Sequence, residues 1–311
     1  MLLSPLWVRV LDHLPILLCS YWTLATAAAA FTLTPGQFCP KFRSAVQLSA
    51  ARGKLCSSTA EAQLGWLARL KVPQQWFLHF YVVGTACNSF LLYTTLPRSD
   101  TAGFSHEQVV TLLSLTLLEV HLIRRMLETA YIMHYPKGAK MHLIAYAFGL
   151  SYYLVLPLSC TPAAQLTTQN AYMSELHAPS WTSLAAQPQY LVGAGVFWAG
   201  NALQFWSHWI LASLQRTTKQ TQTTKSRAGN QYYKMPTGGP FYWISCPHYL
   251  AEIIIYMGLA ILAGQQLPLT ILILCWVVAN LLLAAQPTHS WYRRHFPAYP
   301  RNRKALIPYL Y

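Results

Sequence analysis

The chain has 311 residues, of which 54 % are hydrophobic and only 10 % are charged. Water-soluble domains usually carry about 25 % charged residues, so this composition excludes an ordinary soluble protein and favours a chain embedded in a membrane. The formal net charge is +14, from 22 basic and 8 acidic residues. Because the basic residues lie between long apolar runs and do not cover one soluble face, they predict contact with membrane lipid and not with nucleic acid.

Long apolar runs predict the membrane-spanning helices, since a span needs about 20 mostly apolar residues. The seven candidate runs are 11–31, 75–96, 108–132, 141–160, 189–213, 243–264 and 267–286. The first run ends in ATAAAA, as a cleaved signal peptide can, but no compact basic segment precedes it and Asp12 and His13 stand before the apolar stretch, which favours a retained helix. We therefore expect an all-α integral membrane protein, a bundle of about seven transmembrane helices.

The basic residues give this bundle an orientation. All lysines and arginines except Arg9 and Arg98 fall in the first, third and fifth loops, in the C-terminal tail, or at the membrane edge beside them. Basic residues accumulate in cytosolic loops, so these segments are predicted to be cytosolic. The N-terminus is then lumenal and the C-terminus cytosolic.

Several kinds of site are not expected. The seven cysteines are scattered and contain no C-x-x-C pair, so neither a zinc site nor a disulfide framework is predicted, and no metal is assigned. The segment GAGVFWAG at 193–200 lacks the third glycine of a dinucleotide-binding fingerprint and follows no strand. Its small residues instead predict a face that packs against another helix.

Polar side chains recur inside four of the predicted spans, in their cytosolic halves. They are His79 near Trp76 in the second span, His121, Arg125 and Glu128 in the third, Gln204 and His208 in the fifth, and His248 and Glu252 in the sixth. Ionisable residues are costly in a bilayer and normally face the bundle interior or a wet cavity. A packed histidine or an interhelical ion pair is the alternative for any one of them, but together they predict one shared cavity.

The C-terminal third resembles the steroid 5α-reductase family. The resemblance rests on YKMPTGGPFYWISCPHYLAEIIIY at 233–256 and on the pattern Y-P-x-x-R-K-A-L-I-P from Tyr299 to Pro308. Within that family, the segments VPQQWFLHFY at 72–81, HLIRRMLETAY at 121–131, FGLSYY at 148–153 and QFWSHWIL at 204–211 resemble the polyprenol (polyprenal) reductase branch. The resemblance covers about residues 70–311 and implies seven transmembrane helices and reduction of α,β-unsaturated carbonyls with NADPH. It also implies a role in dolichol synthesis for protein N-glycosylation at the endoplasmic reticulum membrane.

The resemblance implies a division of the chain and a cofactor site. Residues 1–73 would form the first transmembrane helix and a basic cytosolic loop, and residues 74–311 the reductase membrane domain with a C-terminal NADPH-binding region. The residues expected to bind NADPH are Trp76, Arg125, Gln204, His208, Tyr233, Lys234, His248, Glu252, Tyr292 and Arg303. Steroid-reducing relatives carry Asn at the positions of Gln204 and His248 and Asp at that of His208, and all three replacements can still form hydrogen bonds.

The expected substrate contacts depart from those of steroid-reducing relatives. Those relatives hold the substrate carbonyl with a Glu and a Tyr, where this chain has Phe80 and Leu122. The neighbouring His79 and His121 are the predicted replacements, as donors to the enolate oxygen that develops during hydride transfer. This departure favours a long-chain isoprenoid, polyprenal or polyprenol, over a steroid as the main substrate.

Three other functions fit parts of the sequence. A steroid 3-oxo-Δ4 5α-reductase would share the cofactor and the chemistry. An isoprenylcysteine-type membrane methyltransferase also pairs a membrane bundle with a basic C-terminal cofactor region, but it binds S-adenosylmethionine. A transporter or a structural membrane protein would show internal repeats and broken helices in matching halves, and the sequence has no repeat.

Overall fold

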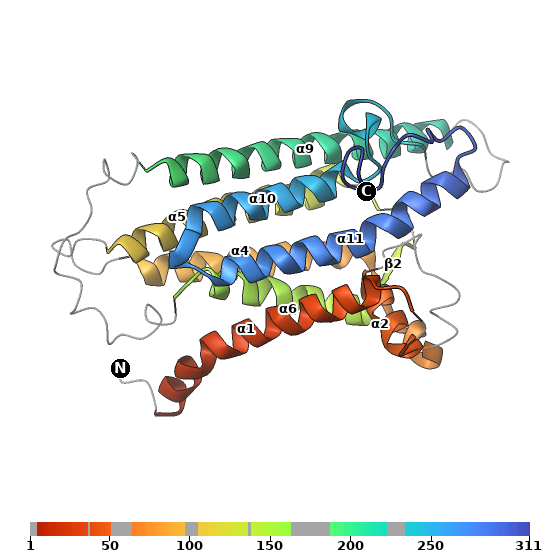
Figure 1. Ribbon diagram of the computed structural model, residues 1–311. Coiled ribbons are helices and arrows are strands. Elements are labelled where there is room, and N and C mark those ends of the chain that lie inside the picture. The colour runs from red at the N-terminus through yellow and green to blue at the C-terminus, as the bar shows by residue number, and fades with distance from the viewer. Residues whose placement is uncertain are drawn as a thin grey trace.

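The computed structural model describes residues 5–36, 38–50, 64–96, 105–135, 138–162, 187–222 and 234–311. Its main feature is a bundle of long helices that run side by side (Figure 1). They are α1 (Pro5–Leu33), α4 (Phe77–Thr95), α5 (His106–Leu127), α6 (Leu143–Ser159), α9 (Pro188–Gln222), α10 (Pro247–Ala263) and α11 (Leu269–His295). Each coincides with one of the apolar runs predicted from the sequence.

Three segments of these helices are long and apolar enough to cross a membrane, Asp12–Leu33, Pro247–Gln266 and Leu269–His295. The predicted class, a mostly helical membrane protein, is thereby confirmed. A total of seven spans and the lumenal position of the N-terminus stay predictions.

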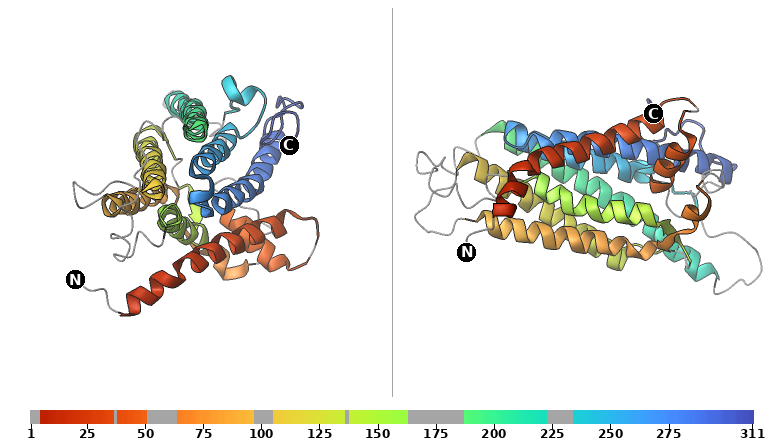
Figure 2. Two further views of the ribbon diagram at one scale, coloured as in Figure 1. Left: turned by 60° about the vertical axis from the view of Figure 1, so that its left-hand side comes forward. Right: turned by 90° about the horizontal axis from the view of Figure 1, so that it is seen from below.

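Successive long helices run in opposite directions, so the loops alternate between the two ends of the bundle (Figures 1 and 2). One end, called the basic end below, holds α2 (Pro40–Ala50), the C-terminus and a short sheet. In that sheet β1 (Lys71–Pro73) pairs antiparallel with β2 (Lys140–His142). The pairing joins the first and third basic loops at the same end, as the charge pattern requires.

Short 3-10 segments connect several of these elements, and a π-helical turn extends α5. The 3-10 segments are η2 (Gly65–Arg69), η3 (Gln74–Trp76), η6 (Gly239–Tyr242) and η7 (Gly264–Gln266), and the π-helical turn is η4 (Glu128–Ile132). Single π turns inside helices are frequent at functional sites because they shift which residues face inward. Here the turn begins at Glu128, which is part of the polar stripe predicted on this helix.

The helix ends follow from local residues. Ser105 and Gln108 form a capping box at the start of α5, where each side chain bonds the backbone N–H of the other. Pro247 occupies the first turn of α10, where its missing N–H is not needed. This proline starts α10 four residues later than the apolar run predicted, because residues 243–246 form a turn that pairs with the tail at Ile244 and Lys304 instead.

Close packing of α9 on α10 sets the geometry of the functional site. A Cβ at Gly200 would lie 2.8 Å from the backbone nitrogen of Ile255, and one at Gly258 would lie 2.4 Å from that of Phe197. Gly193 is equally close to Leu262, whereas Gly195 has no neighbour within 4 Å. The predicted packing face therefore exists, and it brings the polar residues of these two helices within hydrogen-bonding distance.

The first helix lies at the edge of the bundle but is joined to it (Figure 2). Trp22 is fully buried, and its indole N–H donates to Ser159 Oγ at 2.8 Å. Tyr21 shares a hydrogen bond of 2.9 Å with Ser151 and stacks on Phe148. These contacts make α1 part of the core that also includes α6 and α11.

Candidate active site

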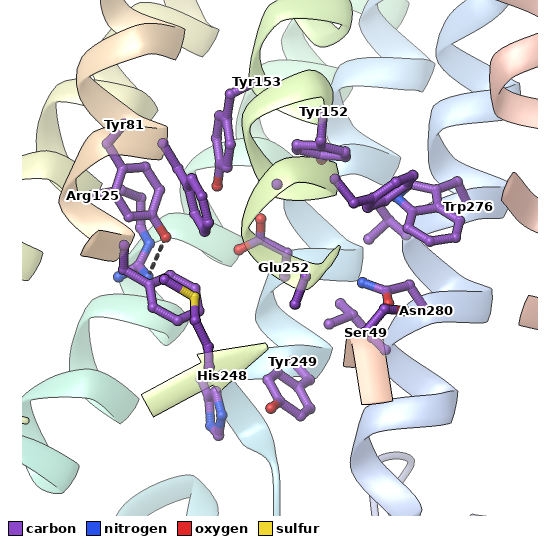
Figure 3. A pocket seen from close by; sticks show the side chains of 18 of the residues that line it. Ser49, Tyr81, Arg125, Tyr152, Tyr153, His248, Tyr249, Glu252, Trp276 and Asn280 are labelled. Carbon is purple, nitrogen blue, oxygen red and sulfur yellow. Dashed lines mark hydrogen bonds between the residues drawn. The ribbon is translucent and has the colours of Figure 1, made fainter. Parts of the chain in front are cut away.

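A cavity opens inside the bundle, toward the basic end, and is lined by two sets of side chains with unlike chemistry (Figure 3). The first, called the polar half below, consists of Arg125, Gln204, His208, His248, Glu252 and Asn280. The second, called the aromatic half, consists of Phe77, Phe80, Tyr81, Phe148, Tyr152, Tyr153, Tyr249 and Trp276. Ser49 of α2 and Met141 of β2 also line the cavity, so elements of the basic end contribute to its wall.

Five residues predicted to bind the cofactor meet in the polar half. Arg125 comes from α5, Gln204 and His208 come from α9, and His248 and Glu252 come from α10. On each helix they lie three or four residues apart, so they share one inward face. The structure thus brings together side chains that are up to 127 positions apart in the sequence.

Glu128 anchors this polar half although it does not line the cavity. Its side chain is 2 % exposed and is paired with both Arg124 and Arg125, the latter at 2.6 Å. His208 Nδ1 lies 2.8 Å from the same carboxylate oxygen and donates to it. A buried carboxylate is tolerated only when such partners satisfy its charge and lone pairs, so Glu128 fixes the positions of both arginines.

Glu252 is the carboxylate that faces the cavity, with 20 % of its side chain exposed. Its Oε2 accepts a hydrogen bond from the amide nitrogen of Gln204, whose amide oxygen accepts one from Arg124. These two bonds assign the orientation of the Gln204 amide. The charges of Arg124 and Arg125 are therefore balanced by Glu128 and Glu252, and the polar half is preorganised without any ligand.

His121 lies in the layer behind Glu252 and not in the cavity wall. It is 1 % exposed, its Nδ1 lies 3.0 Å from Asn201 Oδ1, and its Nε2 lies 3.9 Å from Glu252 Oε1. Arg124 Nη2 approaches the same Nδ1 to 3.2 Å. His121 therefore does not line the cavity, because Glu252 forms the wall at this point, and its predicted role as a donor stays a prediction.

His79 lies on the outer side of α4, and its predicted role as a donor also stays a prediction. The side chain is exposed, Nδ1 lies 2.9 Å from the hydroxyl of Tyr146, and the ring packs against Trp76 at 5.4 Å. Neither His79 nor Trp76 lines the cavity. Residues two positions apart on an α-helix point in directions about 200° apart, so Tyr81 faces the cavity and His79 does not.

The predicted residues of the C-terminal region form a layer over the basic end. Arg303 is 5 % exposed, and its guanidinium donates to the carbonyl of Pro236 at 2.9 Å and lies over the ring of Tyr299. Tyr292 is buried and stacks on Tyr299, with ring centroids 5.6 Å apart. None of them lines the cavity, and Lys234 is exposed beside this layer. Tyr233 lies outside the described residues.

Hydrogen bonds hold the tail against the start of α10 and the end of α11. Ser245 Oγ lies 2.6 Å from both His289 Nδ1 and the Tyr299 hydroxyl, and it donates to the carbonyl of Lys304. Ile244 and Lys304 form a parallel bridge beside it. The tail motif is thus placed to close the basic end.

Sequence reasoning missed the aromatic half and Tyr81 in particular. The Tyr81 hydroxyl accepts a hydrogen bond of 2.7 Å from Arg125 Nη2, which ties the aromatic half to the polar half (Figure 3). The segment FGLSYY, which carries part of the family resemblance, contains four lining residues, Phe148, Gly149, Tyr152 and Tyr153. A signal was therefore present in that segment, but a Tyr in an apolar span does not by itself reveal which way it faces.

Comparison with known proteins now decides the family. A family model described as 3-oxo-5-alpha-steroid 4-dehydrogenase matches residues 161–311. Polyprenal reductase 1 of Oryza sativa subsp. indica is 30 % identical, over 94 % of this chain and 97 % of that protein. Polyprenal reductases of Caenorhabditis elegans and Danio rerio are 28 % and 30 % identical, over 99 % and 79 % of this chain and 100 % and 81 % of theirs. The chain belongs to the steroid 5α-reductase family.

The family match includes only part of the cavity. Gln204, His208, His248 and Glu252 fall within residues 161–311, whereas much of the aromatic half precedes them. The family model therefore matches the part of the chain that contains most of the polar half and the tail. The full-length relatives, which are named for polyprenal, extend the similarity across most of the chain.

Proposed function

We propose that this membrane protein uses NADPH to reduce the carbon–carbon double bond next to the aldehyde of polyprenal, a step of dolichol synthesis. The observation that carries the proposal is the two-part cavity, which joins a preorganised polar half to an aromatic half inside a helical bundle. A polar cofactor and an apolar substrate can then meet within one site. The names and the near full-length similarity of the relatives support the same substrate class.

The chemistry favours the aldehyde over the alcohol. Hydride adds to the β-carbon of an enal because the conjugated carbonyl oxygen takes up the negative charge that develops. An allylic alcohol offers no such acceptor. Groups placed to stabilise that oxygen accelerate the reaction because they interact more strongly with the transition state than with the bound substrate.

The residues of the polar half fit a nicotinamide cofactor. Its carboxamide and ribose hydroxyls need both donors and acceptors, which Gln204, His208 and Glu252 provide. NADPH, when bound, supplies the hydride. The negative phosphates suit the basic end, where Arg303 Nε–H is buried without a hydrogen-bond partner among the described residues. Lys234 is exposed and close in sequence to Pro236, whose carbonyl accepts from Arg303, and we propose that Lys234 also contacts the phosphates.

The same proposal places the protein in its membrane. The basic end would face the cytosol, where NADPH is available, and the N-terminus would face the lumen of the endoplasmic reticulum. Seven helices would span the bilayer. The isoprenoid chain of the substrate would extend from the aromatic half toward the lipid, since both are apolar.

Purified protein in lipid nanodiscs tests the proposal when NADPH is supplied with polyprenal, polyprenol or a 3-oxo-Δ4 steroid in parallel. We expect the fastest loss of NADPH absorbance with polyprenal. Steroid turnover above polyprenal turnover would favour the steroid alternative. Absence of NADPH consumption with every enal and enone, together with binding of S-adenosylmethionine, would show that the reductase assignment is wrong.

A further inference from the structure

The four tyrosines of the aromatic half differ in whether their hydroxyl group is already used. Tyr81 accepts from Arg125, and Tyr152 donates to the Tyr256 hydroxyl at 2.7 Å. Tyr249 packs against His248 with ring centroids 4.3 Å apart, on the side of the cavity opposite Tyr153 (Figure 3). The Tyr153 hydroxyl has no hydrogen-bond partner within the described ranges of the chain, although its ring lines the cavity.

The Tyr153 ring is held firmly by its neighbours. It stacks on Phe80 at 6.0 Å and meets Tyr81 and Tyr152 edge to face at 5.2 and 5.0 Å. A Cβ at Gly84 would approach Tyr153 Cδ1 to 2.9 Å, so the glycine is what lets the ring sit close to α4. Such aromatic contacts fix an orientation as well as adding stability.

The hydroxyl of this fixed ring points into the cavity toward Glu252 (Figure 3). Glu252 belongs to the polar half, where the cofactor is proposed to lie. A substrate carbonyl bound between the two halves would therefore come within reach of the Tyr153 hydroxyl. Buried donors are normally paired, so an unpaired hydroxyl that faces the cavity is suited to bind a ligand oxygen.

We propose that Tyr153 is the catalytic residue that donates a hydrogen bond to the aldehyde oxygen of the enal, a role that rests on the reductase function proposed above. Hydride from the nicotinamide cofactor forms a C–H bond at the β-carbon. The π electrons of the carbon–carbon double bond shift toward the carbonyl, whose oxygen becomes an enolate held by Tyr153. A proton from water then adds to the α-carbon and restores the aldehyde, so the substrate gains two hydrogen atoms in total.

This assignment replaces the two histidines predicted from the sequence. His79 lies on the outer side of α4, and His121 is separated from the cavity by Glu252. Tyr81 is less suited than Tyr153, because its side chain is 5 % exposed and the hydrogen bond that its oxygen accepts holds the hydroxyl toward Arg125.

The test compares Tyr153→Phe with Tyr146→Phe, since both tyrosines lie on α6 but the Tyr146 hydroxyl bonds His79 outside the cavity. We expect Tyr153→Phe to lower kcat for polyprenal about 100-fold, as removal of a single oxyanion donor does elsewhere. The affinity for NADPH should stay unchanged, because Tyr153 lies in the aromatic half. Tyr146→Phe should keep kcat close to that of the unmodified protein.

Replacing Tyr153 with fluorinated tyrosines provides a second measurement, because these residues keep the shape of the side chain and should leave the fold intact. They keep the ring and the hydroxyl but make the hydroxyl a stronger donor, so kcat should vary steadily with their acidity. A structural role would leave kcat constant across the series. Turnover by Tyr153→Phe within about twofold of the unmodified protein, a factor worth less than 1 kcal/mol, would overturn the assignment. If the unmodified protein reduces no enal, the proposed function itself fails, whatever the variants do.

Discussion

The two halves of the cavity satisfy their polar groups in different ways. In the polar half, Glu252, Gln204, Arg124 and Glu128 bond one another in a continuous chain. In the aromatic half, rings pack on rings, and one hydroxyl, that of Tyr153, has no partner in the described part of the protein. The difference indicates that the polar half is built to hold a shape, whereas the aromatic half presents the Tyr153 hydroxyl to what it binds.

Breaking the anchor of the polar half should have the largest effect. Glu128→Gln leaves the charges of Arg124 and Arg125 without their buried partner. Loss of one member of a buried ion pair typically costs about 3–5 kcal/mol of stability. We expect a large drop in thermal stability in detergent, with loss of both NADPH binding and turnover.

Glu119→Gln is the matched control for that variant. Glu119 also lies on α5 but accepts from neutral groups, Asn88 Nδ2 at 2.7 Å and Ser89 Oγ at 2.6 Å. Its neutralisation should cost no more than about 1–3 kcal/mol, the scale of a hydrogen bond to a charged group, and spare NADPH binding. Equal losses of stability and NADPH binding in both variants would contradict the anchoring role of Glu128.

Glu252→Gln should weaken NADPH binding by an intermediate amount, without disturbing the aromatic half. The substitution keeps the size of the side chain but removes the charge that faces the cavity and accepts from Gln204. We expect the Kd for NADPH to rise about tenfold, equivalent to about 1.4 kcal/mol, in a direct binding measurement. An unchanged Kd would show that Glu252 does not contribute to binding of the cofactor.

Gly84→Ala should affect the aromatic half alone. The added methyl group would collide with the Tyr153 ring at 2.9 Å and with Leu122 at 3.3 Å. Overpacking of this kind costs about 1–3 kcal/mol and shifts the side chain that is hit. We expect slower polyprenal turnover with normal NADPH affinity. Gly195→Ala, where no atom lies within 4 Å, provides the control and should change neither quantity.

His79→Ala should have the smallest effect on turnover. The side chain is exposed and contacts Trp76 and Tyr146 outside the cavity. We expect kcat to stay within about threefold of the unmodified protein, less than 1 kcal/mol on the barrier. A loss of kcat as large as that expected for Tyr153→Phe would indicate that His79 takes part in the reaction. It would contradict the position of His79 outside the cavity.

The sequence was sufficient to predict the helices and the end at which the basic loops meet. Run length and charge are summed over many residues, so these signals survive local exceptions such as the late start of α10 at Pro247. The polar stripes on α5, α9 and α10 were also predictable, because an ionisable residue in a membrane has few places to point.

The inward face of α4 and α6 could not be predicted in the same way. Both helices are apolar on all sides, so periodicity does not distinguish the side facing the cavity from the side facing lipid. His79 was predicted because it is ionisable, whereas Tyr81 and Tyr153 are the residues that line the cavity. The tail motif shows a further limit. The pattern around Arg303 identifies the family, but it does not show whether each side chain touches the ligand or supports the fold.

The most direct test of the central claim is the identity of the product formed from polyprenal and NADPH by the purified protein, determined by its mass and by its NMR spectrum, since reduction of the double bond and reduction of the aldehyde give products of equal mass. A two-part site that adds hydride to the double bond predicts a product that is heavier by two hydrogen atoms and still carries its aldehyde. A product in which the aldehyde has become an alcohol and the double bond remains would contradict the proposed reaction, and so would unchanged polyprenal in the presence of intact NADPH.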